Sequence, residues 1–126
     1  MLVKIVILNW NGAEHLRRFL PSVVTAAPDG MEIIVADNGS TDDSVAVLNA
    51  DFPSVRVIRL DANYGFAEGY NRALAQLKAD CIVLLNSDVE TPAGWLEPLI
   101  AALENDPGVA AVAPKLRALT APAKFE

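Results

Sequence analysis

Four short apolar runs, each followed directly by polar and glycine residues, constrain the fold of this sequence more than any other feature. They cover residues 3–8, 32–36, 55–60 and 81–85, and segments of helical period separate them. Short strands that alternate with helices are typical of a parallel sheet with helices on its faces. The sequence therefore predicts an α/β fold with a mostly parallel sheet flanked by helices.

Helices are expected in the segments between and after these runs. Pro21 lies inside the first of them and is expected to kink or divide it, because proline cannot donate a helical hydrogen bond. The expected helices are about residues 13–26, a helix capped by Ser40 or Thr41, about residues 66–77, and a helix from Thr91 to Leu103. A last apolar run follows at residues 109–113, and beyond Pro114 the pattern predicts no further element.

The third run differs from the first in the charge that it carries. Arg56 and Arg59 interrupt it, whereas the first run is apolar apart from Lys4. A continuous apolar run is typical of a strand covered on both faces, and an interrupted one indicates a strand that is less fully covered. The third strand is therefore expected toward an edge of the sheet.

The polar residues that follow the runs are expected to meet at one edge of the sheet, because parallel strands all end there. They form a first loop (residues 9–12), a second loop (37–42), a third loop (61–65) and a fourth loop (86–90). Open α/β sheets bind their ligands at this carboxyl edge. The coincidence of four such loops predicts a binding site there.

Two carboxylates of these loops follow strands that are expected to be buried on both faces, which would hold them rigidly. Asp37 and Asp88 could accept hydrogen bonds from ribose hydroxyl or ring N–H groups, or coordinate a hard divalent cation. Asp61 is interpreted instead as part of a solvated turn. Asp42 is interpreted as a helix-start residue that interacts with exposed N–H groups.

Composition and charge exclude several classes of protein. The 126 residues are 52% hydrophobic and carry 16 acidic against 10 basic side chains, which describes one globular domain with a net charge of −6. Without a basic cluster, nucleic acid is not expected as a partner. No apolar run approaches the roughly 20 residues that span a bilayer. The single cysteine, Cys81, allows no intramolecular disulfide and fits a reducing compartment.

Several catalytic and cofactor motifs are missing from the sequence. His15 is the only histidine and is interpreted as a surface residue, so neither a zinc site nor a Ser-His pair can be assembled. Gly-x-Ser-x-Gly, Gly-x-Gly-x-x-Gly and the Walker A sequence are all absent. These absences argue against a serine hydrolase, a dinucleotide-binding enzyme and a P-loop protein.

The four loops together resemble the motifs of the family 2 glycosyltransferases, inverting enzymes with the Rossmann-like GT-A fold that binds nucleotide-diphospho-sugars. The resemblance spans residues 3 to about 114, and the Asn-Trp-Asn-Gly and Leu-Leu-Asn-Ser-Asp variants are most similar to a rhamnosyltransferase-like branch that builds bacterial surface polysaccharides. The segments that carry it are VILNWNG (6–12), VADNGSTD (35–42), NYGFAEGYN (63–71) and LLNSD (84–88).

The resemblance implies transfer of a sugar, with inversion, from a nucleotide-diphospho-sugar to an acceptor hydroxyl, in polysaccharide or glycoconjugate synthesis. It implies a UDP- or dTDP-linked donor and a saccharide or lipid-linked acceptor. The backbone at Leu8 and Asn9, with the Asp37 carboxylate, would hold the base and ribose. The other residues implied to line the nucleotide-sugar pocket are Asn11, Asn38, Gly39, Asn63, Gly65, Gly69, Asn71 and Ser87.

The resemblance also implies that Asp88, with Asn86, holds Mg²⁺ or Mn²⁺ against the donor diphosphate. A chain of charge −6 that presents a carboxylate to a diphosphate would repel it unless a dication intervened. Asn86 stands where the family motif has its first acidic residue, so only Asp88 offers a charged oxygen. Asparagine can still contribute a neutral carbonyl oxygen.

The expected domain organisation is a nucleotide-sugar-binding core over residues 1–114 and a tail over residues 115–126 that leads toward an acceptor-binding half. The chain is expected to be truncated, with the general base beyond Glu126, since no motif assigns that role to Glu90. A cytoplasmic location is expected, at the inner face of the membrane for the full-length protein.

Two alternatives have the same fold class. A nucleotidyltransferase would carry a glycine-rich basic phosphate loop after the first strand, and the first loop contains no lysine or arginine. A flavodoxin-like binding or regulatory domain would use Asp37 and Asp88 only to receive a phosphate or a cation. Retention of a pyrimidine nucleotide would separate this second alternative from the glycosyltransferase.

Overall fold

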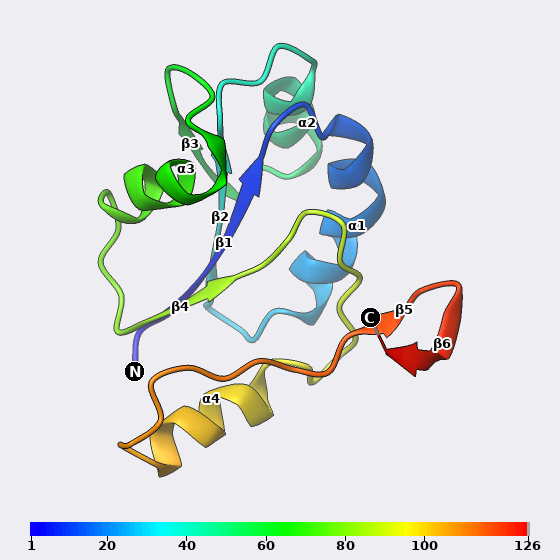
Figure 1. Ribbon diagram of the computed structural model, residues 1–126. Helices are drawn as coiled ribbons and strands as arrows, with labels where there is room; N and C mark the ends of the chain where they lie inside the picture. The colour runs from blue at the N-terminus through cyan, green and yellow to red at the C-terminus, as the bar shows by residue number, and fades with distance from the viewer. Residues whose placement is uncertain (126) are drawn as a thin grey trace.

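The computed structural model describes residues 1–125 and is built around a four-stranded sheet in the order β3-β2-β1-β4 (Figure 1). Every pairing in this sheet is parallel, which confirms the predicted α/β architecture. β3 lies at one edge, as its charged residues predict, and β4 lies at the other. The strands are β1 (Val3–Asn9), β2 (Glu32–Asp37), β3 (Arg56–Arg59) and β4 (Cys81–Leu84).

Helices cover both faces of the sheet. α1 (Ala13–Ala26) and α2 (Ser44–Asp51) pack on one face, and α3 (Gly65–Leu74) lies on the other (Figure 1). Alternate residues of each strand pack on opposite faces of the sheet, because successive strand side chains point in opposite directions. Toward α1 and α2 the core holds Ile5, Ile7, Leu16, Leu20, Val35 and Leu48, and toward α3 it holds Val6, Ile34, Ile58 and Tyr70.

The structure confirms α1 at its predicted boundaries and corrects the start of α2. Pro21 lies within α1 and does not divide it. α2 begins at Ser44 and not after Ser40 or Thr41, because the first loop engages both residues. The Asn11 backbone N–H donates to Ser40 Oγ at 2.9 Å, and Asn11 Oδ1 accepts the Thr41 backbone N–H at 2.7 Å.

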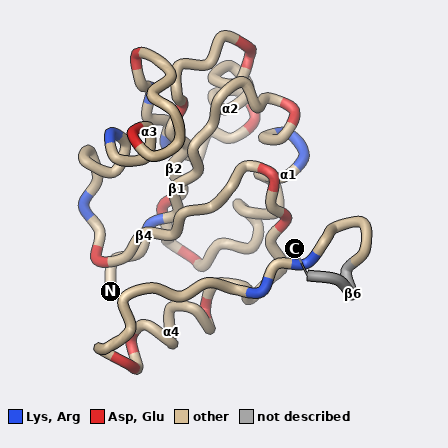
Figure 2. The backbone as a smooth tube through the Cα atoms, in the orientation of Figure 1, with Lys and Arg blue, Asp and Glu red and all other residues tan. Residues whose placement is uncertain are grey.

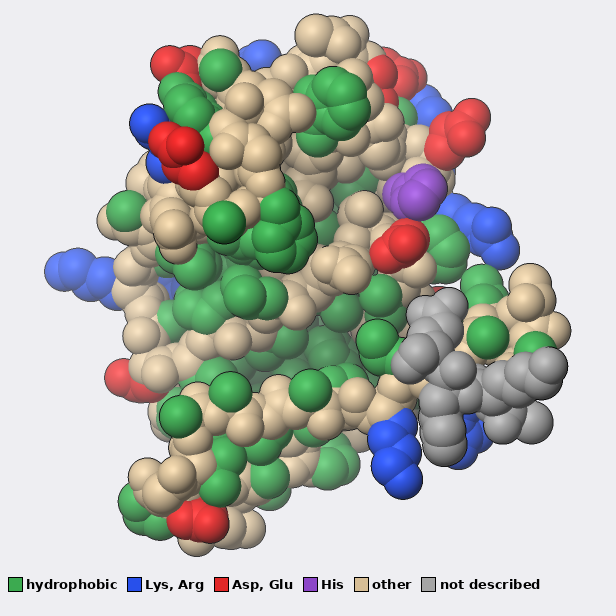
Figure 3. Space-filling view, viewed as in Figure 1, with side chains coloured by type: hydrophobic (Ala, Val, Ile, Leu, Met, Phe, Trp, Pro, Cys, Tyr) green, Lys and Arg blue, Asp and Glu red, His purple; other side chains and the backbone are tan. Residues whose placement is uncertain are grey.

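The prediction of a helix from Thr91 was wrong by six residues, since α4 spans Glu97–Asn105. Gly94 has a φ of +74°, which a right-handed helix cannot contain. Residues 91–96 instead attach to α1, where the Thr91 N–H donates to Ser22 Oγ at 3.1 Å and Leu96 is buried in the core. No residue of α4 itself is buried, and hydrophobic side chains gather between α4 and the body of the molecule (Figure 3).

The C-terminal part of the chain also differs from the expectation. Residues 109–113 form no strand, and a hairpin of β5 (Arg117–Ala118) and β6 (Ala121–Phe125) follows where no element was predicted. Its two-residue strand is too short to produce a recognisable alternation. Glu126, the last residue of the predicted tail, lies outside the described residues.

Charged residues are distributed over the loops and helix surfaces rather than gathered by sign (Figure 2). Ion pairs among the described residues include Lys4–Glu32, Arg17–Asp43, Arg56–Glu32 and Arg72–Glu68. No helix in the described part of the chain is both long and apolar enough to cross a membrane.

Candidate functional site

The ends of β1 and β2 are joined by a buried polar pair at the carboxyl edge. Asn9 is 1% exposed and its Nδ2 donates to Asp37 Oδ1 at 3.1 Å. Asp37 is 2% exposed, and its Oδ2 accepts the Ser40 backbone N–H at 3.0 Å. The Asn9 carbonyl accepts the Asn38 N–H at 2.8 Å. The pair fixes the first loop against the second loop.

A glycine makes room for this pair. The Asn9 Oδ1 atom is buried without a hydrogen-bond donor among the described residues, and it lies 2.5 Å from the position where a Cβ on Gly12 would stand. Any larger residue at position 12 would therefore displace a buried side chain. Gly12 of the Asn-Trp-Asn-Gly loop is therefore needed for the packing of Asn9, whether or not the loop also binds a ligand.

The second and third loops are joined through Asn38. Its Nδ2 donates to Asn63 Oδ1 at 3.2 Å and to the Gly65 carbonyl at 3.0 Å, and its Oδ1 accepts the Tyr64 N–H at 3.0 Å. Both amide N–H groups of Asn38 are thus used inside the protein. Gly69 allows this arrangement, because a Cβ there would stand 2.9 Å from Asn38 Nδ2.

Three of the four loops therefore form one bonded unit, and it contains most of the predicted pocket residues. Within the described part of the chain, no hydrogen bond joins this unit to Asn86, Ser87 or Asp88 of the fourth loop. Asn71 lies exposed on α3 and also makes no hydrogen bond through its side chain there. The structure thus brings together Leu8 of β1, Gly69 of α3 and the predicted residues of the first three loops, which are Asn9, Asn11, Asp37, Asn38, Gly39, Asn63 and Gly65.

The fourth loop presents side-chain oxygens that take part in no hydrogen bond or ion pair within the described part of the chain. Asp88 and Asn86 are exposed, and no ion pair or hydrogen bond among residues 1–125 occupies the Asp88 carboxylate. The described part of the chain contains no group of three His, Cys, Asp or Glu side chains that could hold a metal ion without further ligands. Mg²⁺ is typically bound through one or two carboxylates together with substrate phosphates. One free carboxylate and one amide carbonyl fit that mode of binding.

Trp10 is a candidate contact that the sequence reasoning missed. Its side chain is 55% exposed at the end of β1, between two asparagines of the first loop. A large aromatic ring at a strand end is costly to expose and offers a flat face on which a base or sugar can stack. Its position directly after the first apolar run was the signal available in the sequence.

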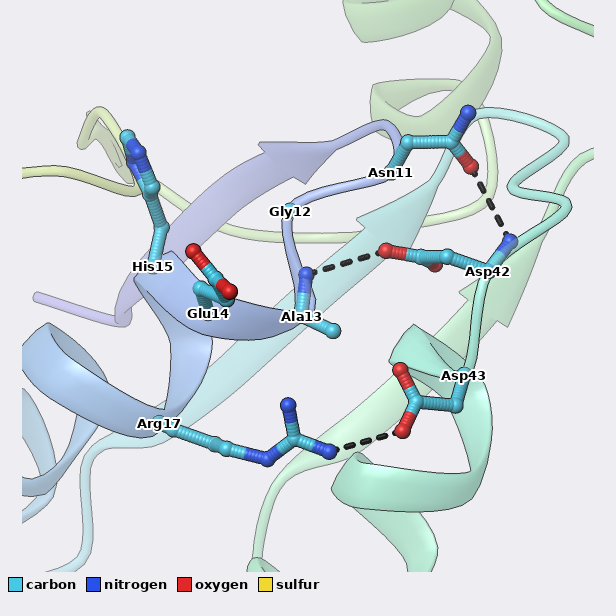
Figure 4. Close-up of a pocket in the computed structure, with 8 residues that line it drawn as sticks. All are labelled: Asn11, Gly12, Ala13, Glu14, His15, Arg17, Asp42 and Asp43. Atoms are coloured by element: carbon cyan, nitrogen blue, oxygen red, sulfur yellow. Dashed lines mark hydrogen bonds and ion pairs between the residues drawn. The ribbon is translucent and has the colours of Figure 1, made fainter.

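A hollow lies beside this edge, at the start of α1. It has a volume of about 420 Å³ and is lined by Asn11, Gly12, Ala13, Glu14, His15, Arg17, Asp42 and Asp43 (Figure 4). His15 is exposed in its wall and contacts the ring of Phe19. None of Asp37, Asn63 and Asp88 lines it. Pocket shape alone therefore does not mark the site that the four loops indicate.

A second hollow of about 360 Å³ lies on the outer side of the third loop. Arg72 stacks over the Tyr64 ring at 3.7 Å, and the Tyr64 hydroxyl donates to Asp61. That hydrogen bond lowers the pKa of Asp61. Asp61 is exposed, which agrees with its interpretation as part of a solvated turn.

Asp42 links the starts of two helices, as its position in the second loop predicts. Its Oδ2 accepts the Ala13 N–H at 3.1 Å (Figure 4). Its Oδ1 accepts the Ser44 N–H at 2.9 Å. Burial would raise the pKa of Asp42, but the hydrogen bonds from Ser44 and Ala13 outweigh it and lower the pKa below 3.8. The carboxylate thus stabilises the folded chain at neutral pH.

Replacing Asp42 with alanine is expected to lower the free energy of unfolding by about 2 kcal/mol, since one helix cap contributes about 1 kcal/mol. Because the folded-state pKa is depressed, the stabilisation is present above pH 3.8 and is lost as the pH falls through the folded-state pKa. Urea unfolding at pH 7 and pH 3 measures both effects. The control is Asp43→Ala, which removes only an exposed ion pair with Arg17. Equal losses in the two variants at pH 7 would contradict the capping role.

The sequence model of glycosyl transferase family 2 matches residues 4–119. The chain is 29% identical over 127 residues to an N-acetylglucosaminyl-diphospho-decaprenol L-rhamnosyltransferase of Mycobacterium tuberculosis, covering 92% of this chain and 41% of that protein. It is 35% identical over 121 residues to a pre-mycofactocin glycosyltransferase of the same species, covering 93% of this chain and 24% of the relative.

A solved structure has the same fold. The mannosyltransferase of Pyrobaculum calidifontis, in complex with GDP-Man and Mn²⁺, superposes with a TM-score of 0.77 at 22% identity, covering 92% of this chain and 36% of that one. The likeness confirms the predicted Rossmann-like GT-A fold. The chain spans less than half the length of each of these proteins. The family match extends from the first strand into the C-terminal hairpin, and the chain belongs to glycosyl transferase family 2.

Proposed function

We propose that this chain binds a nucleotide-diphospho-sugar at the carboxyl edge of its sheet and supplies the donor and metal site of a sugar transfer that inverts the anomeric centre. One observation carries the proposal. Three loops are bonded into a rigid unit around Asn9 and Asp37, and at the same edge the fourth loop leaves the Asp88 carboxylate without a partner among residues 1–125. A nucleoside needs a rigid set of hydrogen-bonding groups, and a metal-bound diphosphate needs a free carboxylate.

The rigid unit would hold the nucleoside. Asp37 has lone pairs beyond the two hydrogen bonds that it accepts, and the amide nitrogens of Asn11 and Asn63 donate no hydrogen bond within residues 1–125. The Trp10 ring offers an exposed face for the base. These groups together offer stacking, acceptors and donors, which is what recognition of a pyrimidine base and ribose requires. UDP and dTDP are the proposed nucleotides.

The fourth loop would hold a divalent metal, Mg²⁺ or Mn²⁺, through Asp88 and the Asn86 carbonyl. When bound, the metal would neutralise the diphosphate and stabilise the charge that develops on the departing nucleoside diphosphate. Asp88 can take this role without losing another contact, because it has none in the described chain. The mannosyltransferase that shares the fold is a complex with GDP-Man and Mn²⁺, which supports the same pairing of ligands here.

The acceptor is proposed to be a saccharide or a lipid-linked sugar. A relative that covers most of this chain is named as a rhamnosyltransferase acting on N-acetylglucosaminyl-diphospho-decaprenol. A similar acceptor would place the reaction at the cytoplasmic face of the membrane, in the synthesis of a surface polysaccharide or glycoconjugate. The first loop, which has no lysine or arginine to bind a triphosphate, does not favour a nucleotidyltransferase.

Replacing Asp37 with asparagine is expected to weaken nucleoside binding about tenfold, with or without Mn²⁺, since a lost acceptor in a buried site costs about 1–3 kcal/mol. The new amide group would face the donors Asn9 Nδ2 and Ser40 N. Calorimetric titration with uridine and thymidine measures the loss, and circular dichroism checks the fold. The matched control is Asp61→Asn, an exposed carboxylate of the third loop. Unchanged nucleoside affinity in Asp37→Asn would argue against the proposed base site.

A further inference from the structure

β1 and β4 separate at the carboxyl edge of the sheet, between the unit formed by the first three loops and the fourth loop. Their pairing runs in register from Val3↔Cys81 to Val6↔Leu84, and the Leu85 N–H still donates to the Val6 carbonyl at 3.1 Å. In a parallel ladder the next hydrogen bond would run from the Leu8 N–H to the Leu85 carbonyl. Beyond that point β1 continues beside β2 alone, and the chain after β4 turns into the fourth loop.

The hydroxyl of Tyr70 occupies the place of that missing bond. The Leu8 N–H donates to Tyr70 Oη at 3.4 Å, and the same hydroxyl donates to the Leu85 carbonyl at 3.4 Å. One oxygen atom thus stands between two strands that would otherwise bond directly. Both backbone groups keep a partner, but the strands are held further apart than a ladder bond would hold them.

The ring of Tyr70 is fixed in this position. The residue is buried in the core between the sheet and α3, and Phe66, one turn earlier on that helix, packs edge-on against it with ring centroids 5.0 Å apart. Burial also raises the pKa of Tyr70, so the phenol keeps its proton at neutral pH and continues to donate to Leu85. The hydroxyl is therefore a permanent spacer between β1 and β4.

We infer that Tyr70 is a positioning residue whose hydroxyl sets the gap between the nucleoside unit at the end of β1 and the metal-binding fourth loop after β4. The inference rests on the proposed function, in which one ligand spans that gap. Without the hydroxyl, the Leu8 N–H and the Leu85 carbonyl either bond directly, which draws the fourth loop toward Asn9 and Asp37, or both lose the partner that fixes their separation. The nucleoside site, which lies on the β1 and β2 side, keeps its own contacts.

The test is a Tyr70→Phe variant of the chain, titrated with the corresponding nucleoside and with whichever of UDP, dTDP and GDP binds the wild type best. Each diphosphate titration is made with and without Mn²⁺. We expect nucleoside affinity to stay within about twofold and the enhancement by Mn²⁺ to fall about tenfold, since leaving a buried backbone group mispaired has effects of this order. The control is Tyr64→Phe, the other tyrosine of the chain, whose hydroxyl bonds to Asp61 on the outer side of the third loop.

The outcomes separate this inference from the proposed function. If Tyr70→Phe keeps the full enhancement by Mn²⁺, or loses nucleoside affinity by the same factor as diphosphate affinity, the hydroxyl only supports the fold and the inference is overturned. If the wild type binds none of the three nucleotides, the proposed function itself fails. A loss confined to the Mn²⁺ enhancement, and absent from Tyr64→Phe, supports the spacer role.

Discussion

Replacing Gly39 with alanine is expected to destabilise the fold by about 3 kcal/mol or more. Gly39 has a φ of +74°, a conformation that costs an L residue about 1–2 kcal/mol. An added Cβ would also stand 2.6 Å from the Ala62 carbonyl carbon and 2.8 Å from the Asn63 nitrogen. Both are backbone atoms, so the strain cannot be relieved by turning a side chain, and overpacking of this kind adds about 1–3 kcal/mol.

The matched control for Gly39 is Gly30, which has nearly the same backbone conformation in open space. Its φ is +77°, and apart from its two chain neighbours no described residue has an atom within 4 Å of its added Cβ. Gly30→Ala is therefore expected to show the conformational cost alone, about 1–2 kcal/mol. Urea unfolding of both variants measures the difference, which reports the contact between the second and third loops. Equal losses would contradict the predicted clash between the added Cβ and the backbone of the third loop.

Replacing Asp88 with alanine is expected to leave stability unchanged and to abolish the effect of Mn²⁺ on nucleotide binding. The side chain is exposed and unpaired within residues 1–125, so its removal should alter the unfolding free energy by less than about 0.5 kcal/mol. A charged metal ligand at a diphosphate contributes several kcal/mol. Its loss should therefore weaken binding of the diphosphate in Mn²⁺ by about a hundredfold.

Glu90→Ala is the control for Asp88, because Glu90 is an exposed carboxylate two residues further along the same loop. Calorimetric titration of both variants with the preferred nucleoside diphosphate, with and without Mn²⁺, measures the effect. Glu90→Ala should behave as the wild type. If both variants lose the enhancement equally, general negative charge rather than ligation by Asp88 is responsible, and the assignment of the metal ligand is wrong.

The sequence predicted the parallel sheet, the position of β3 at an edge and the extent of α1, because apolar periodicity and parallel connections determine these features. It did not predict where α4 begins, since the left-handed Gly94 is a backbone conformation that composition does not reveal. The hairpin of β5 and β6 also escaped prediction. These two strands pair only with each other, and no apolar pattern in the sequence marks them.

For the site, the sequence predicted which residues collect at the carboxyl edge but not how they are used. Asn38 was assigned to the nucleotide pocket on resemblance, and the structure uses its amide to join the second and third loops. Gly69 of α3 approaches Asn38 of the second loop closely, a contact between segments that are far apart in sequence. No sequence pattern indicates the role of Tyr70, because its hydroxyl replaces a hydrogen bond between β1 and β4 that is missing only where the two strands separate. The ligand-binding roles of all the predicted site residues, Asn71 and Ser87 included, stay predictions.

The most direct test of the proposed function is calorimetric titration of the wild-type chain with UDP, dTDP and GDP, each with and without Mn²⁺. We predict that at least one of them binds, and that Mn²⁺ strengthens the binding by about a hundredfold through the Asp88 carboxylate of the fourth loop. Failure of all three to bind would contradict the donor site, and binding that is indifferent to Mn²⁺ would contradict the role of Asp88.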